Sequence, residues 1–439
     1  MLICDKIVLI NIERGIALAK LLIQESNPLL GTVRVSGAKN AALPILAATI
    51  LGTEDIILED LPKLKDVEVM CEVLQSLGAT VEKLDEHRVK INSNTINKYE
   101  VDYQLMHKMR ASFIVMGALI GRMGKARSSM PGGCAIGARP VDLHLKGFRS
   151  LGVNVDVEEA DEYTDIFAHA DNLAGNKIYL DFPSVGATQN IILAAALAQG
   201  ETVIDNAAME PEIVDMVNFL NKMGAKIYGA GTSTIRIRGV EKLLGATHQI
   251  MPDRIEAGTF MVAAAATHGD IILNNVIVSH MRPVIAKLRE TGCEIYEEAD
   301  SLRIIATKKL KPIKVKTLPY PGFPTDMQAQ FMALETIIEG KSEVIETVFE
   351  NRFMHVDELR KLGADIDVED RTATVKGVAK LHGAEVNATD LRAGAALVIA
   401  ALCAEGETKL SDIYHIDRGY EDFEEKFRLL GAKVYRVEE

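Results

Sequence analysis

Cys134 stands in a stretch whose composition suggests reactive chemistry, SSMPGGCAIGARPVDLHL. Pro131, Gly132 and Gly133 lead into it, and Arg139 follows five residues later. A cysteine flanked by glycines in a loop is expected to be exposed, and a nearby arginine stabilises its thiolate form. These residues predict a thiol that can give and take a proton, although a loop cysteine without a role also fits the local sequence. The other four cysteines stand in apolar contexts and are expected to pack as small hydrophobic side chains.

His144 lies ten residues after Cys134 and raises the alternative of a cysteine–histidine hydrolase. It falls in LHLKGF on a predicted amphipathic helix, and no Asn or Asp partner pattern accompanies it. A structural histidine is therefore the favoured interpretation. The sequence has no GxxxxGKS/T, no GxGxxG after a strand and no HExxH. Nothing implies ATP, NAD or a metal ion, and we expect no cofactor.

Six helices are predicted to open with a polar cluster, and each opening lies 37 to 42 residues before a recurring glycine. Their key residues are Lys39, Arg110, Ser184, Arg254, Asp326 and Arg392. Helix N-termini carry unpaired N–H groups and a partial positive charge, so they attract anions. Capping alone explains any single opening equally well. Together, with Lys and Arg in first turns where the dipole disfavours them, the six openings predict an anion-binding site, in which Ser184, Val185 and Gly186 form a backbone nest for a diphosphate.

Two further helix starts carry charged residues. ENRFMH contains Arg352, and YHIDRGYED contains Asp417 and Arg418 at the corresponding point one repeat later. A capped helix with a surface ion pair is the alternative explanation for both. Asp326 lies between proline-fixed turns and a helix in PYPGFPTDMQAQ. A carboxylate held rigidly in this way suits a general base, although N-capping is an equal interpretation.

A repeated phrase organises the whole chain: a helix end, then Leu, Met or Thr before a glycine, a small residue and a strand. Its glycines are Gly78, Gly152, Gly224, Gly292, Gly363 and Gly431, at spacings of 74, 72, 68, 71 and 68 residues. Six copies at a nearly constant period indicate a structural repeat. A glycine at a helix C-cap can adopt the left-handed conformation, which suits this position.

Each repeat is predicted to contain a buried Ala-rich helix, a strand, an amphipathic outer helix and a hairpin. The last copy stops after one strand, AKVYRVEE, so we expect the N-terminal strands LLIQ and GTVRVSG to complete it. Two domains of three repeats follow: residues 39–251, and residues 1–38 with 252–439. Residues 1 to about 20 have weak strand character and no motif.

The composition is that of a soluble globular protein, with 48% hydrophobic and 25% charged residues among 439. The net charge of −13 argues against nucleic acid and anionic membranes as partners, because both require a basic face. Five widely spaced cysteines without a CxxC pair are unlike a disulfide framework or a zinc site and indicate a reducing cytosol. The sequence contains no apolar run of membrane-spanning length, and its N-terminus makes a poor signal peptide.

Several of these segments are similar to motifs of the enolpyruvyl transferase family: GAKNAALP, MRAS, PGGCAIGARPVDLH, PDRIEAGTF, FPTDMQAQ, ENRFMH, TDLRA and HIDRGYE. The resemblance runs from about Leu21 to the C-terminus. It implies an inverted α/β barrel fold of six βαβαββ units in two domains, three units in each. The cysteine loop and the SGAKN opening resemble the branch that acts on a UDP-sugar rather than the sister branch that acts on shikimate 3-phosphate.

The resemblance also implies the roles of individual residues. Cys134 is expected to protonate C3 of phosphoenolpyruvate, and Asp326 to accept the proton of the sugar 3′-hydroxyl. Lys39, Arg139 and Arg418 are expected to bind the phosphate and the carboxylate, so Lys39 and Arg418 join the catalytic set. The UDP-N-acetylglucosamine site is expected to include Asn40, Arg110, Arg139, Pro140, Val141, Asp142, Leu143, Ser184, Val185, Gly186, Asp326 and Val348. The helix starts noted above add Arg352 and Arg392.

The implied reaction transfers the enolpyruvyl group to UDP-N-acetylglucosamine with release of phosphate, the first committed step of peptidoglycan precursor synthesis. Its cationic intermediate must be kept from water, so the Cys134 loop and the domains are expected to close over the substrates. A cytoplasmic monomer or weak oligomer is expected. Two alternatives are an enolpyruvyl transferase for another acceptor and a non-catalytic paralogue that binds UDP-sugars. The intact Cys134, Asp326 and Arg418 speak against the second.

Overall fold

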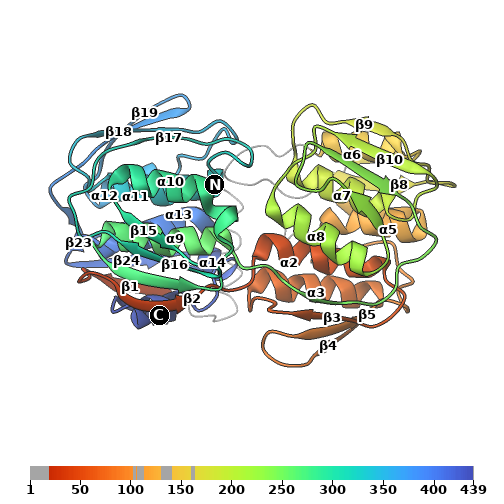
Figure 1. Ribbon diagram of the computed structural model, residues 1–439, viewed down its shortest axis with the longest axis horizontal. Helices are drawn as coiled ribbons and strands as arrows, with labels where there is room; N and C mark the ends of the chain where they lie inside the picture. Colours follow the sequence, from red (N-terminus) through yellow and green to blue (C-terminus); the bar gives the residue numbers. More distant parts are fainter. Residues whose placement is uncertain (1–18, 102–104, 106–112, 130–140, 160–163, 439) are drawn as a thin grey trace.

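The computed structural model describes residues 19–101, 105, 113–129, 141–159 and 164–438. Their buried apolar side chains form two clusters, one within residues 38–251 and one within residues 21–35 and 255–434. The clusters correspond to two domains that lie side by side (Figure 1). The chain passes between them twice, and the two crossings pair: Ala38 N donates to Met251 O at 2.7 Å, and Asp253 N to Ser36 O at 2.9 Å. We propose domain boundaries at 38/39 and 251/252 from this division of the core.

The described residues of the N-terminal domain form three inner and three outer helices. The inner helices are α2 (Lys39–Ala48), α5 (Val115–Met123) and α7 (Val185–Ala195), and the outer ones are α3 (Lys65–Leu77), α6 (Asp142–Ser150) and α8 (Pro211–Lys222). One sheet has the order β13 (Thr247–Gln249), β3 (Ile56–Glu59), β5 (Val89–Asn92), β4 (Thr80–Lys83). The second has the order β11 (Lys226–Tyr228), β12 (Thr234–Arg238), β10 (Glu201–Asp205), β9 (Lys177–Tyr179), and the third β6 (Lys125–Ser129), β8 (Thr164–His169), β7 (Asn154–Glu159).

The C-terminal domain repeats this plan. Its inner helices are α9 (Arg254–Ala266), α11 (Gln328–Glu335) and α13 (Leu391–Leu402), and its outer ones α10 (Arg282–Thr291), α12 (Val356–Lys361) and α15 (Phe423–Leu429). The first two sheets are β15 (Glu294–Glu297), β16 (Ser301–Ile305), β14 (Asp270–Asn274), β2 (Leu30–Arg34), and β17 (Lys314–Lys316), β18 (Lys341–Ile345), β20 (Thr372–Lys376), β19 (Asp365–Glu369). The third is β22 (Glu385–Asn387), β24 (Glu407–Ser411), β1 (Lys20–Gln24), β25 (Lys433–Val437), and β21 (Leu381–His382) pairs with β23 (Ala404–Glu405).

The inner helices are buried on nearly every face, as their Ala-rich sequences predict. In α9, all residues from Ile255 to Ala266 are buried. Small side chains let α9, α11 and α13 contact one another at the centre of the domain, while the sheets lie outside them (Figure 1). This arrangement of three βαβαββ units per domain, with helices inside, confirms the predicted inverted α/β architecture.

The six repeat glycines have positive φ, as predicted for helix C-caps. The values are 109° at Gly78, 87° at Gly152, 106° at Gly224, 107° at Gly292, 95° at Gly363 and 93° at Gly431. A residue with a Cβ atom is disfavoured in this conformation. The repeat in the sequence is therefore a repeat in backbone geometry.

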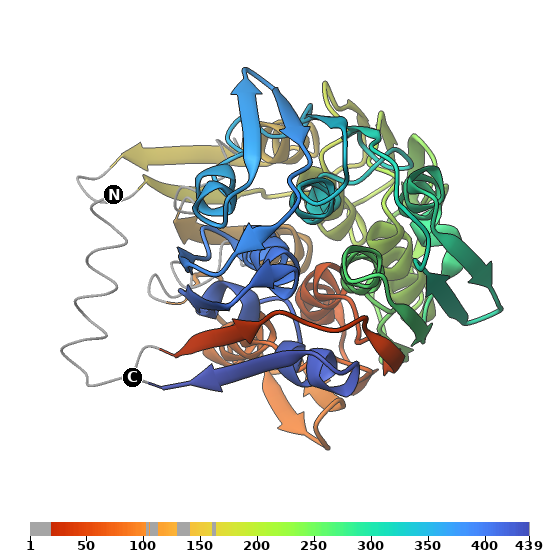
Figure 2. The same cartoon turned by 90° about the vertical axis from the view of Figure 1, so that its left-hand side faces the viewer.

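The prediction for the N-terminal strands was right for one strand and wrong for the other. β1 lies between β24 and β25 and pairs antiparallel with both, so it completes the last repeat (Figure 2). β2, the segment GTVRVSG, instead pairs in parallel with β14, placing Val33 opposite Leu273. The parallel edge strand of this sheet is therefore formed by the chain segment that precedes the first crossing between the domains. In the same way β13, which precedes the second crossing, pairs with β3.

No helix in the described part of the chain combines the length and apolar character that a membrane span requires.

Glu335 is a buried acid at the end of α11. Its side chain is fully buried, and neither carboxyl oxygen has a hydrogen-bond partner among the described residues. Burial raises the pKa of Glu335 well above 4.5, and the distant Lys287 offsets this only in part. The unfolded chain releases this proton at lower pH than the folded protein does. The free energy of unfolding therefore falls as pH rises above about 4.5.

Replacing Glu335 by Met should stabilise the protein at alkaline pH, because it removes a carboxyl group that must either ionise in the core or stay protonated. We expect the free energy of unfolding at pH 8 to rise by about 1–3 kcal/mol, with a smaller gain at pH 4, as measured by urea denaturation. Glu339→Met, at an exposed position nearby, is the matched control. A gain at pH 4 equal to that at pH 8 would contradict the assignment.

Candidate active site

Lys39, Asp66 and Arg418 form an ion cluster across the domain boundary. Lys39 is the first residue of α2, and Asp66 lies in the first turn of α3 in the same domain. Arg418 follows the short helix α14 (Tyr414–Asp417) of the other domain. Arg418 Nε donates to Asp66 Oδ1 at 2.8 Å, and Lys39 Nζ lies 3.4 Å from Asp66 Oδ2. One carboxylate therefore holds two cations that come from different domains.

The charge of Lys39 depends on these neighbours. Burial lowers its pKa below the usual 10.5, and the positive charges of Arg392 and Arg418 lower it further. Asp66, and to a smaller extent Asp326, raise it again. The balance leaves an ammonium group with little hydration, which favours tight binding of an anionic ligand.

Asp326 is the centre of a second ion cluster, in the C-terminal domain. It lies in the 3₁₀ turn Thr325–Met327, which Pro324 precedes. Arg352 Nη2 donates to Oδ1 at 3.0 Å, and Arg392 donates to Oδ2 from Nε at 3.2 Å and from Nη2 at 3.0 Å. Both arginines are almost fully buried, and their Nη1 atoms have no hydrogen-bond partner among the described residues. Those N–H groups fit an anionic or carbonyl-bearing ligand.

Arg254 makes a third pair, again between domains. It opens α9 of the C-terminal domain, and its Nε donates at 2.9 Å to Oε1 of Glu212, in the first turn of α8 of the N-terminal domain. Burial alone would lower the pKa of Arg254, but the carboxylates, with Glu212 first, outweigh it and raise the pKa. The guanidinium also lies 5.6 Å from the Tyr320 ring centre.

A hydrogen-bond network beneath Asp326 fixes the position of its backbone. Gln330 Nε2 donates to Asp326 O at 2.9 Å and to Thr259 Oγ1 at 3.2 Å. Thr259 Oγ1 also lies 2.9 Å from Tyr420 Oη. The network joins α9, α11 and the segment that carries Arg418, so these three elements share one buried polar contact.

Val348 belongs to a loop that is tied to the same turn. Glu346 Oε1 accepts from Val348 N at 2.7 Å and from Thr317 Oγ1 at 2.8 Å. Its other oxygen accepts from Thr325 Oγ1 at 2.8 Å. The carboxylate of Glu346 is buried and links the Val348 loop to the residue before Asp326.

The predicted nest at the start of α7 has the expected cap. Ser184 is the N-cap, and its Oγ accepts from Ala187 N at 3.3 Å. The ring of His144 lies close to Gly186, because a Cβ there would come within 3.0 Å of Cε1 of His144. His144 Nδ1 lies 2.8 Å from Asn190 Nδ2. Asn190 lies 46 residues away on another helix, so no local sequence pattern marks this contact.

Comparison with known proteins identifies the family to which this chain belongs. A family model described as EPSP synthase (3-phosphoshikimate 1-carboxyvinyltransferase) matches residues 23–427. Two proteins named UDP-N-acetylglucosamine 1-carboxyvinyltransferase, from Finegoldia magna and Caldanaerobacter subterraneus, are each 60% identical over 95% of this chain, and the matches cover 98% and 99% of those proteins. The chain belongs to the enolpyruvyl transferase family.

Solved structures show the same relationship. The enolpyruvyl transferase NikO from Streptomyces tendae superimposes with a TM-score of 0.86 at 27% identity, over 96% of this chain and all of that one. EPSP synthase from Acinetobacter baumannii superimposes with a TM-score of 0.73 over the same 96% of this chain and all of its own, at 19% identity, a likeness of fold alone. This enolpyruvyl transferase thus shares the two-domain fold of both.

Five predicted site residues of the enolpyruvyl transferase lie in the two ion clusters: Lys39, Asp326, Arg352, Arg392 and Arg418. Asn40 is exposed at the start of α2, and Val141, Asp142 and Leu143 lie at the start of α6, which packs against α7. Cys134, Arg110, Arg139 and Pro140 lie outside the described residues. Sequence reasoning missed Asp66 and Glu212, whose only signal was an acidic residue in the first turn of an outer helix.

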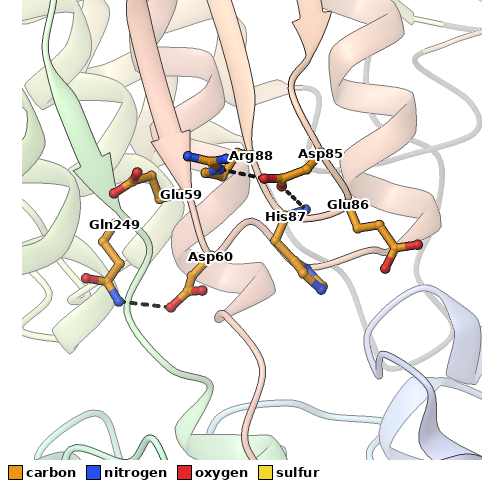
Figure 3. A pocket seen from close by; sticks show the side chains of 7 residues that line it. All are labelled: Glu59, Asp60, Asp85, Glu86, His87, Arg88 and Gln249. Atoms are coloured by element: carbon orange, nitrogen blue, oxygen red, sulfur yellow. Dashed lines mark hydrogen bonds and ion pairs between the residues drawn. The ribbon is translucent and has the colours of Figure 1, made fainter.

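The pocket drawn in Figure 3 does not suit anionic substrates of an enolpyruvyl transferase. It measures about 480 Å³ and is lined by Glu59, Asp60, Asp85, Glu86, His87, Arg88 and Gln249. Four of these seven side chains are acidic, so the pocket disfavours a phosphate group.

The thiols that the structure describes have the packing role expected from their sequence contexts. Burial raises the pKa of Cys71 to about 11 and that of Cys403 to about 12, and it also raises the pKa of Cys293. No group of three or more His, Cys, Asp or Glu side chains in the described ranges could hold a metal ion.

Gln330→Leu should lower activity more than Thr259→Val, because only Gln330 contacts the backbone of Asp326. We expect kcat to fall about tenfold when the turn loses this bond, whereas Thr259→Val should cost about 1 kcal/mol of stability and change kcat less than threefold. Steady-state phosphate release and thermal unfolding of both variants test this. Equal losses of kcat would show that the network acts as one unit and that the Asp326 contact has no special weight.

Proposed function

We propose that this protein transfers the enolpyruvyl group of phosphoenolpyruvate to the 3′-hydroxyl of UDP-N-acetylglucosamine and releases phosphate. The carrying observation is the pair of buried arginines, Arg352 and Arg392, on the Asp326 carboxylate, in a chain 60% identical to proteins named for this reaction. The product is a peptidoglycan precursor.

The cationic clusters supply the binding chemistry for a small molecule with two anionic groups. Lys39 and Arg418 lie on one carboxylate and can share a phosphate or carboxylate between them. Arg139, outside the described residues, is proposed to join them. Arg352 and Arg392 present buried N–H groups that have no hydrogen-bond partner among the described residues, and Arg392 lies near enough to Lys39 to lower its pKa.

The reaction needs an acid for C3 and a base for the sugar hydroxyl. We assign the first role to Cys134: its thiol proton passes to C3, and C2 becomes electron-poor. The 3′-oxygen then bonds to C2 while Asp326 takes its proton, which gives a tetrahedral intermediate. Phosphate leaves as C3 gives a proton back, and the double bond re-forms. The two guanidinium groups on Asp326 stabilise its ionised form, which is the form that accepts a proton.

The remaining substrate contacts stay predictions. Ser184, Val185 and Gly186 are proposed to bind the diphosphate at the start of α7, where backbone N–H groups point outward from the helix end. Asn40, Arg110, Val348 and the segment 139–143 are proposed to line the rest of the UDP-sugar site. A cytoplasmic location and a monomer or weak oligomer, without nucleic acid or membrane partners, also remain predictions.

Phosphate release with alternative acceptors tests the function. The protein should release phosphate from phosphoenolpyruvate when UDP-N-acetylglucosamine is present, and not when shikimate 3-phosphate replaces it. Mass spectrometry should show the enolpyruvyl ether of the UDP-sugar. Turnover with shikimate 3-phosphate alone would overturn the proposal.

Asp326→Asn should lower kcat by about 10²–10³ with little change in the KM for UDP-N-acetylglucosamine, because the amide cannot accept the proton, while its one acceptor oxygen keeps a hydrogen bond to one of the two arginines. Asp365→Asn, at an exposed position in β19, is the matched control and should leave kcat unchanged. The comparison is made by steady-state kinetics on variants with unchanged thermal unfolding. A wild-type kcat in Asp326→Asn would remove Asp326 from the mechanism.

A further inference from the structure

Asp66 is a buried carboxylate that the proposed reaction does not use. Its side chain is only 4% exposed. The other acidic residue in the first turn of the same outer helix, Glu68, is 58% exposed. Both of its oxygens face cations: Oδ1 accepts from Arg418, and Oδ2 faces Lys39. A buried ion is costly unless it is paired. Asp66 is paired with two cations that are proposed to bind the substrate, which suggests that it has a function at the site.

We propose that Asp66 is a positioning residue that holds Lys39 and Arg418 at one locus across the domain boundary, ready for the anionic substrate. This inference rests on the proposed function, because that function makes Lys39 and Arg418 ligands of phosphoenolpyruvate. Arg418 keeps about a third of its side chain exposed, 34%. Its guanidinium group can therefore meet a ligand while Asp66 holds its Nε.

The local backbone suits a carboxylate at this point. α3 begins at Lys65, and its N-cap, Leu64, offers no side-chain acceptor to the helix end. A negative charge in the first turn is stabilised by the helix dipole. Since α2 and α3 pack together, Asp66 reaches Lys39 at the start of the neighbouring helix.

The electrostatics add a second effect of Asp66. Among the described residues, the charged groups that face Lys39 are Asp66 on α3, Arg418 after α14, Arg392 on α13 and Asp326 in the turn before α11. Burial and the two arginines lower the pKa of Lys39, and Asp66 is the largest influence that raises it. Without Asp66, Lys39 should lose its proton at lower pH.

Two other contacts join the C-terminal domain to its neighbour. His87 Nδ1 lies 3.5 Å from Glu421 Oε1, and Arg254 Nε donates at 2.9 Å to Glu212 Oε1. His87 belongs to the hairpin end drawn in Figure 3. Removing the charge of Asp66 therefore leaves two contacts in place, and the domains should keep their arrangement.

Asp66→Asn tests the proposal, with Glu68→Gln on the same helix as the matched control. Steady-state kinetics with both substrates from pH 6 to 10 should show a KM for phosphoenolpyruvate raised about tenfold in Asp66→Asn. The alkaline limb of kcat/KM for phosphoenolpyruvate should move to lower pH. Glu68→Gln should match the wild type in both measurements. A lower KM would show that Asp66 competes with the substrate, and would overturn the proposal.

A second measurement needs no turnover. Competitive acetylation of the substrate-free protein, followed by peptide mass spectrometry, gives the titration of Lys39. It should move to lower pH in Asp66→Asn and not in Glu68→Gln. An unchanged Lys39 titration with a lowered kcat would mean that Asp66 is merely structural, which also overturns the proposal. If the wild type releases no phosphate with UDP-N-acetylglucosamine, the function fails, and the acetylation still decides the role of Asp66.

Discussion

The pairing of buried cations with a few shared carboxylates is the constraint on which this structure depends. Lys39, Arg254 and Arg392 all open helices, where the dipole opposes positive charge, and burial opposes it again. Each is stabilised by a carboxylate: Asp66, Glu212 and Asp326 respectively. Because the Asp66 carboxylate also binds Arg418 and the Asp326 carboxylate also binds Arg352, each of these two clusters carries more positive than negative charge. That excess is what a doubly anionic substrate can neutralise.

The fold brings these charges together by its two crossings. α2 begins directly after the first crossing and α9 directly after the second, so Lys39 and Arg254 lie where the chain changes domain. The strands β2 and β13, which precede the crossings, stay in the sheets of the domain that the chain is leaving. Helices α2 and α9 are thereby each anchored in one domain while their polar first turns lie at the boundary. Ion pairs between domains, such as Arg254–Glu212 and Arg418–Asp66, follow from this placement.

The sequence predicted the features that repeat or that depend on local geometry. The six glycines required positive φ, the Ala-rich helices required a buried position, and the polar openings within the described residues required helix N-termini. The pairings of Asp66 with Arg418 and of His144 with Asn190 join residues 352 and 46 positions apart, and no local pattern marks them. β2 was assigned to the wrong sheet for the same reason. Its sequence predicts a strand, but it does not indicate that the strand pairs with β14.

Lys39 differs physically from the arginines around it. A guanidinium group keeps its charge at any pH at which the protein is folded, so Glu212 and Asp326 can only position their arginines. The ammonium group of Lys39 is buried beside two arginines and can lose its proton. Its carboxylate partner, Asp66, therefore influences the charge of Lys39 as well as its position. When the proposed substrate binds, its anionic groups would raise the pKa of Lys39, as Asp66 does. The proposed site therefore combines fixed positive charge, which would attract an anionic substrate, with one cation, Lys39, whose protonation depends on the neighbouring charges.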